Sequence, residues 1–97
     1  MVIHIVLFKI KEQATKEQIQ AFYENLYKIK ENIPGIISIS GGNNTSPEEH
    51  YKGFTEGFVI TFKDKESRDN YLPHEGHQKL IKNYIEPIIK DVLVFDY

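Results

Sequence analysis

The sequence predicts an α+β domain in which helices cover one face of an antiparallel sheet. Hydrophobic residues alternate with a period of two in four segments and follow helical spacing in the segments between them. The predicted elements run in the order strand, helix, strand, strand, helices, strand, which is the order of a ferredoxin-like fold. The chain shows no internal repeat and no linker, so residues 1–97 are expected to form one domain.

The first strand and the first helix carry the clearest local signals. Side chains alternate between two faces over residues 2–10, as they do along a strand. Thr15 and Gln18 then have the spacing of a capping box, which predicts the start of a helix. Pro34 and Gly35 end that helix. Its apolar stripe recurs every three or four positions and consists of Ile19, Phe22, Tyr23, Leu26, Ile29 and Ile33.

The rest of the chain supplies three more strands and two more helices. The turn formers at residues 41–44 close the second strand. Asp64 is the predicted N-cap of a short helix that ends at Pro73. A further helix runs from Gly76 to Glu86 and stops before a proline. The three strands are predicted at residues 36–40, 54–62 and 91–97.

The first and last strands are apolar on both of their faces. A two-layer monomer would leave one face of its sheet in water, and an apolar patch of that size usually marks an interface. The sequence therefore predicts a homodimer that covers this face about a twofold axis. On the first strand the covered face is expected to consist of Ile3, Ile5 and Leu7, while Val2, His4, Val6 and Phe8 point the other way. The last strand places Leu93, Phe95 and Tyr97 on one side and Val92, Val94 and Asp96 on the other.

Composition narrows the classes of function. Twelve Lys and Arg against fourteen Asp and Glu give a net charge of −2, so no nucleic-acid partner is expected. The chain has no cysteine, which excludes disulfides, thiolate catalysis and Cys-ligated metals. The longest apolar run, residues 2–8, is much shorter than the ~20 residues of a membrane span, and no secretory signal is recognisable. We therefore expect a cytoplasmic protein without a membrane partner.

Several segments together resemble the stress-responsive A/B barrel domains. They are HIVLFKIK at residues 4–11, NIPGI at 32–36, YLPHEGH at 71–77 and DVLVFDY at 91–97. In this order and spacing the resemblance covers nearly the whole chain. It implies a dimeric α+β barrel, in which the sheets of two subunits pair. It also implies chemistry without a cofactor, because a plant member of the family performs an aldol condensation on a linear polyketide unaided.

The resemblance carries over particular residues. The catalytic His and Tyr of that plant member match His77 and Tyr71, and its pocket His on the first strand matches His4. A second pocket His is replaced here by Glu56, and the HPxH motif of the family reads HEGH. Backbone carbonyls that hold magnesium in one plant member match the positions of Lys30, Ile33 and Ile36.

The chemistry of these side chains suits proton transfer. His77 has a functional interpretation as a general base, because an imidazole titrates near neutral pH, and a structural one as a tie between the helix start and nearby backbone. Tyr71 either donates a hydrogen bond to an enolate oxygen or sits at the edge of the core with its hydroxyl in water. His4 and Glu56 either form a His–carboxylate relay, or Glu56 reaches solvent near the end of its strand.

The aromatic stripe allows two interpretations as well. Two groups of side chains either line an apolar cavity for a small oxygenated ligand or pack as core. They are Phe22, Tyr23 and Leu26 of the first helix, and Val6, Phe8 and Phe58 of the strands. The sequence thus leaves three functions open: a cofactor-free enzyme or binding protein for a small apolar compound, a stress-associated structural dimer, and a cofactor-free monooxygenase.

Overall fold

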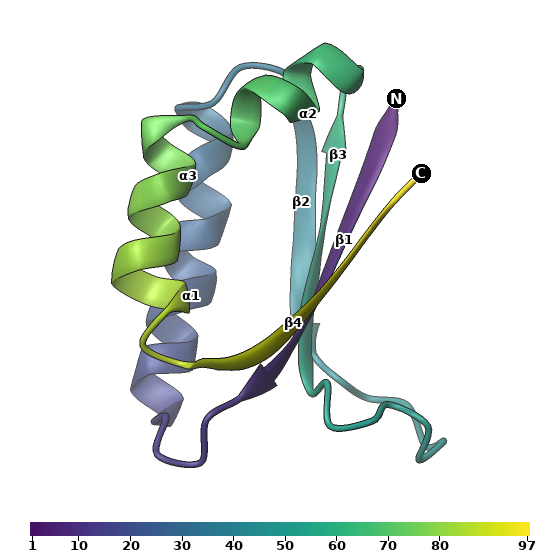
Figure 1. Ribbon diagram of the computed structural model, residues 1–97, viewed down its shortest axis with the longest axis vertical. Coiled ribbons are helices and arrows are strands. Elements are labelled where there is room, and N and C mark those ends of the chain that lie inside the picture. The colour runs from purple at the N-terminus through teal and green to yellow at the C-terminus, as the bar shows by residue number, and fades with distance from the viewer.

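The computed structural model describes residues 1–97 and contains a four-stranded antiparallel sheet with helices on one face (Figure 1). The strand order is β2-β3-β1-β4, which confirms the predicted ferredoxin-like fold. No helix is long and apolar enough to span a membrane. The strands are β1 (Val2–Ile10), β2 (Ile36–Asn43), β3 (Glu56–Phe62) and β4 (Ile89–Asp96), and the α-helices are α1 (Lys16–Lys28), α2 (Lys65–Tyr71) and α3 (Glu75–Leu80).

The predicted capping box begins α1. The Thr15 hydroxyl accepts a hydrogen bond from the Gln18 backbone at 3.1 Å, and the Gln18 side chain accepts one from the Thr15 backbone at 2.9 Å. Two of the four free N–H groups at this end are thereby satisfied. The helix ends in a 3₁₀ turn, after which Gly35 turns the chain into β2 with a φ of 88°, a conformation that suits glycine.

The second half of the helical layer differs from its prediction. Asp64 caps α2 as expected, since its carboxylate accepts from the Ser67 backbone at 2.8 Å. The helix predicted from Gly76 to Glu86 is wrong in its second half, because α3 passes into a π-helix at Ile81–Ile85. This wider turn is closed by a 2.8 Å bond from the Glu86 N–H to the Ile81 carbonyl.

Strand boundaries also differ from the predictions. The expected turn at Gly41 is instead part of β2, which continues to Asn43, whereas β3 begins at Glu56 and β4 at Ile89. Gly41 pairs with Phe58 of β3. A Cβ atom at Gly41 would lie 2.6 Å from the Gly57 carbonyl oxygen, so this glycine permits a close approach of two strands within the sheet.

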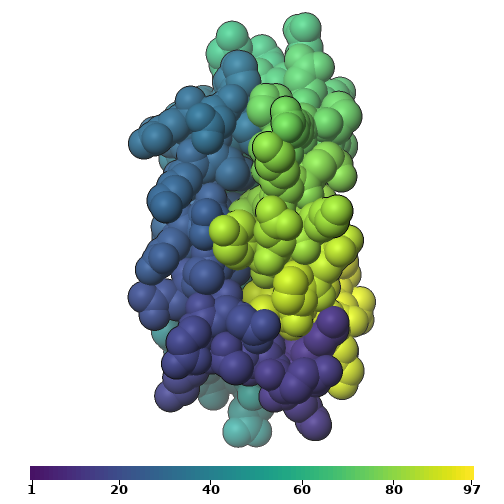
Figure 2. Space-filling model, turned by 90° about the vertical axis from the view of Figure 1, so that its left-hand side faces the viewer, coloured from purple at the N-terminus to yellow at the C-terminus, as the bar shows by residue number.

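The core lies between the sheet and the helical layer. Figure 2 views the helix-bearing side, where α1 and the α2–α3 segment lie next to each other and close that face. The side chains of β1 and β3 that face the helices are buried, and so are Phe22 and Leu26 of α1. The opposite face of the sheet bears no helix (Figure 1), and Leu93, Phe95 and Tyr97 are 44%, 58% and 71% exposed there.

Candidate functional site

A cavity of about 330 Å³ lies between the helix-facing side of the sheet and the α2–α3 segment. Its size falls at the lower end of the range of small-molecule sites, roughly 300–1,000 Å³. Three polar side chains enter an otherwise apolar wall, namely His4 from β1, Tyr71 from α2 and His77 from α3. The apolar part consists of Val6, Phe8, Phe58, Leu72, Ile81, Ile85, Ile89, Val92 and Val94, and Glu86 completes the lining.

His77 is oriented by the backbone in front of its own helix. Its Nδ1 lies 2.9 Å from the carbonyl oxygen of Leu72, which also accepts a hydrogen bond from Gln78 at 2.8 Å. A carbonyl only accepts, so Nδ1 carries the proton and the lone pair of neutral His77 is on Nε2. Burial lowers the pKa of His77, and the bond to Leu72 opposes that effect only in part. His77 is therefore neutral at pH 7.

Tyr71 is almost completely enclosed, with 1% of its surface exposed. Its ring lies against that of His77, with 4.0 Å between the ring centroids. Burial raises the pKa of its phenol, and the negative charge of Asp96 raises it further, so Tyr71 keeps its proton. No protein group forms a hydrogen bond with the Tyr71 hydroxyl. Because every fully buried side-chain polar atom in the structure has a hydrogen-bond partner, this hydroxyl oxygen is not fully buried. The hydroxyl consequently retains contact with the cavity.

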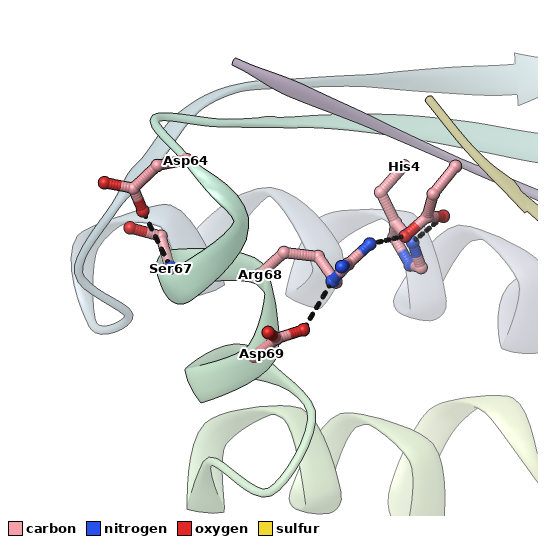
Figure 3. Close-up of polar contacts among 6 residues, drawn as sticks. His4, Asp64, Ser67, Arg68 and Asp69 are labelled. Carbon is pink, nitrogen blue, oxygen red and sulfur yellow. Dashed lines mark hydrogen bonds and ion pairs between the residues drawn. The ribbon is translucent and has the colours of Figure 1, made fainter.

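His4 is held by a carboxylate from the neighbouring strand. Its Nδ1 lies 2.7 Å from Oδ1 of Asp96, and Nη1 of Arg68 donates to Oδ2 of Asp96 at 2.6 Å (Figure 3). Burial opposes ionisation of Asp96, but the hydrogen bonds from Arg68 and His4 outweigh it and lower its pKa. The His4 ring meets Tyr71 edge to face, with centroids 5.7 Å apart.

The predicted relay between His4 and Glu56 is wrong. The register of β1 and β3 places Glu56 opposite Phe8, while the register of β1 and β4 places Asp96 opposite His4. Nor does Glu56 reach solvent, because only 7% of it is exposed. Its two oxygens accept hydrogen bonds from the Tyr23 hydroxyl at 2.8 Å and from Asn43 at 2.7 Å.

The aromatic stripe of α1 does not line the cavity. Phe22 and Leu26 are fully buried in the core, and Tyr23 turns toward Glu56. Burial raises the pKa of Tyr23, and the Glu56 carboxylate adds to the rise. The predicted lining residues on the strands, Val6, Phe8 and Phe58, do border the cavity.

Two residues of the site are missing from the sequence-based set. Asp96 shares an alternating face of its strand with Val92 and Val94, so a charged residue on an apolar face was its signal. Arg68 lies three residues before Tyr71 on α2, a spacing that brings both side chains to one side of the helix.

Metal ligands do not cluster among the side chains: no three His, Asp or Glu residues come together. The carbonyl site predicted at Lys30, Ile33 and Ile36 lies where the 3₁₀ turn leads into β2. None of these residues borders the cavity, and magnesium binding there stays a prediction.

Known proteins match this chain over nearly its whole length. Residues 2–97 match the family model described as Stress responsive A/B Barrel Domain. Olivetolic acid cyclase of Cannabis sativa is 24% identical over 94 residues, covering 97% of this chain and 92% of that protein. A stress-response A/B barrel domain-containing protein, HS1, of Arabidopsis thaliana is 27% identical, with 97% and 85% covered.

Solved structures show the same fold. A protein of Arabidopsis thaliana superposes with a TM-score of 0.92 at 26% identity, covering 100% of this chain and 93% of that one. A dimeric ferredoxin-like protein of unknown function from Jannaschia has a TM-score of 0.85 at 23% identity, with 99% and 96% covered. A hydroxynitrile lyase of Passiflora edulis has a TM-score of 0.89 at 22% identity, with 99% and 90% covered. The chain belongs to the stress-responsive A/B barrel domain family.

Proposed function

We propose that this protein binds and transforms a small, largely apolar compound that carries oxygen atoms, with His77 as base and Tyr71 as hydrogen-bond donor. One observation carries the proposal. Nε2 of His77 and the hydroxyl of Tyr71 both lack a partner in the protein, and both side chains border the same apolar cavity. A buried polar group without a hydrogen-bond partner costs about 1–3 kcal/mol, and a bound ligand or water removes that cost by supplying the partner.

The proton transfer can be followed atom by atom. Nε2 of His77 takes a proton from an acidic C–H or O–H group of the ligand, and the electron pair of that bond remains on the ligand as an enolate or alkoxide. The Nδ1–H bond to Leu72 keeps the ring in place during this step. The Tyr71 hydroxyl donates a hydrogen bond to the new oxyanion, which is stabilised more strongly in an apolar wall than in water.

The family supports this class of function. The relative from Cannabis sativa is named for a cyclisation of a small molecule, and the likeness spans 97% of this chain. The HEGH sequence at residues 74–77 fits the site as well, since the His74 side chain caps α3 by accepting from Gly76 at 2.9 Å. That cap begins the helix from which His77 enters the cavity.

A homodimer is part of the proposal. The helix-free face of the sheet exposes a row of large apolar side chains along β4, and relatives of this fold are described as dimeric. A second copy placed on this face would remove the row from water and produce the barrel that the family name describes.

A thermal-shift screen tests the proposed ligand class. We would screen phenolic, polyketide-like and fatty-acid-like compounds against the wild-type protein. A ligand at one hundred times its Kd adds about 2.7 kcal/mol, which raises the Tm of a domain of this size by roughly 10 °C or more. We expect a class of hits whose shift falls by more than half in His77→Ala and in Tyr71→Phe.

Matched variants control the screen. His50→Ala removes an exposed loop histidine, and Tyr84→Phe removes a hydroxyl outside the cavity, so both should respond like the wild type. Hits that bind all variants equally would contradict the assignment of His77 and Tyr71. A screen without hits would favour a structural dimer, and oxygen consumption with a phenolic hit would favour a monooxygenase.

A further inference from the structure

Arg68 contacts the cavity only through another residue. It lies on α2, one turn before Tyr71, and its side chain is 22% exposed. Its Nη1 donates to Asp96 and its Nε donates to Asp69 at 2.8 Å (Figure 3). The guanidinium is therefore engaged by two carboxylates, and it does not border the cavity itself.

Both carboxylate oxygens of Asp96 contact a side chain. Oδ2 accepts from Arg68 and Oδ1 meets Nδ1 of His4, so the carboxylate links the two residues. The bond to Arg68 helps to keep Asp96 ionised, and an ionised carboxylate is only an acceptor. Nδ1 of His4 must then carry a proton.

The other ring nitrogen of His4 has no partner in the protein. Although only 5% of His4 is exposed, every fully buried side-chain polar atom in the structure has a hydrogen-bond partner. The unpartnered Nε2 is therefore not fully buried. Nε2 of His4 therefore keeps contact with the cavity, as the Tyr71 hydroxyl does. In neutral His4 this nitrogen bears the lone pair.

We infer that Arg68 is a positioning residue: through Asp96 it holds His4 with its proton on Nδ1, so that Nε2 of His4 is a second hydrogen-bond acceptor in the cavity beside that of His77. The inference concerns the free protein and rests on the proposed function only for what occupies the cavity. A planar guanidinium that binds a carboxylate oxygen restricts the rotation of that carboxylate. The ring of His4 is fixed in turn.

The arrangement deepens the proposed function by selecting a class of ligand. Two imidazole acceptors, from His4 and His77, and one hydroxyl donor, from Tyr71, face the apolar wall. The single arginine of the site is neutralised outside the cavity, so no free cation is present to bind a carboxylate or a phosphate. The cavity therefore suits an uncharged compound with hydroxyl or enol groups and a carbonyl.

Histidine ring NMR tests the inference without any ligand. Two-bond ¹H–¹⁵N correlation spectra of ¹⁵N-labelled protein at pH 8 distinguish protonated from unprotonated ring nitrogens, and His→Gln variants assign the four histidines. We expect the wild type to show Nδ1–H and bare Nε2 at His4. In Arg68→Leu, both shifts should move toward the tautomer-averaged values of the exposed His50.

Two further variants separate positioning from folding. Arg68→Lys retains the positive charge and should restore at least half of the lost shift difference, whereas Asp69→Asn leaves the bond to Asp96 in place and should match the wild type. An averaged His4 in the wild type, or an unchanged His4 in Arg68→Leu with intact amide spectra, would overturn the inference. Failure of the proposed function would instead show as a screen without hits and an intact His4 pattern.

Discussion

At the scale of single residues, the environment of His77 determines which form of the imidazole meets a ligand. Burial lowers its pKa, while the Leu72 carbonyl keeps the proton of the neutral ring on Nδ1. A base must be unprotonated before it acts, so lowering the pKa widens the pH range in which Nε2 accepts a proton. The same burial keeps Tyr71 protonated to higher pH.

A pH profile of ligand affinity follows from this environment. An unperturbed histidine has a pKa of about 6.5, and that of His77 lies lower. Affinity for a hydroxyl-bearing hit should thus stay constant from pH 8 down to about 6.5 and decline only on further acidification, as Nε2 becomes protonated. Isothermal titration calorimetry measures this, with His50→Ala as the control. A decline that begins above pH 7 would contradict the role of His77.

The buried polar residues were easier to predict than the residues to which they bind. The polar residues on apolar strand faces, His4 and Glu56, were recognisable from the alternation alone, and both are buried. Their partners depend on which strands are neighbours and in what register, and the β1–β4 pairing brings Asp96 to His4. A one-residue change of register turns every side chain to the other face, so periodicity within one strand cannot supply this information.

At the scale of elements, β2 depends on two adjacent glycines with different surroundings. A Cβ atom on Gly41 would lie 2.6 Å from the Gly57 carbonyl oxygen and 2.7 Å from Cβ of Phe58, whereas one on Gly42 would have no neighbour within 4 Å. Neither glycine has a positive φ, so steric contact alone distinguishes them. Gly41 is required where β2 approaches β3, and Gly42 is not.

Alanine substitutions test this contrast. Gly41→Ala should reduce the free energy of unfolding by about 1–3 kcal/mol, because the strands must separate to admit a methyl group. Gly42→Ala should be neutral or stabilise by up to about 1 kcal/mol, since it restricts the unfolded chain without a clash. Urea denaturation followed by circular dichroism compares the two. Equal stabilities would show that β2 adjusts freely to the added side chain.

The elements themselves were largely predictable, because capping residues and periodicity are local. Thr15, Gln18 and Asp64 act as expected at the starts of α1 and α2. The exceptions are non-local in origin. Glycines 41 and 42 suggest a turn until the neighbouring strand is known, and the π-helix at Ile81–Ile85 leaves no mark in the helical spacing. That turn presents Ile81 and Ile85 to the cavity, in keeping with the frequent occurrence of π-turns at functional sites.

At the scale of the whole molecule, the sheet has one covered face and one bare face. The bare face holds Ile5 and Leu7 of β1, and Phe95 of β4 lies directly opposite Ile5. Phe95 is 58% exposed, and its neighbours on the same face are apolar as well. Contiguous apolar surface of this kind is rare on monomers and is the usual basis of a symmetric dimer.

Charges placed on this face test the dimer. Ile5→Asp and Phe95→Asp each introduce a carboxylate that a second copy would have to bury without a partner, and burial of an unpaired charge is strongly unfavourable. We expect both variants to be monomeric or less stable in size-exclusion chromatography with light scattering, while the wild type elutes as a dimer.

Phe95→Asp is the stricter test, because Phe95 is exposed in the single chain and its replacement leaves the core intact. Tyr27→Asp alters an exposed position on α1 and should remain dimeric. If both sheet variants are dimers of wild-type stability, the subunits associate through another surface, and the bare face of the sheet has a different role.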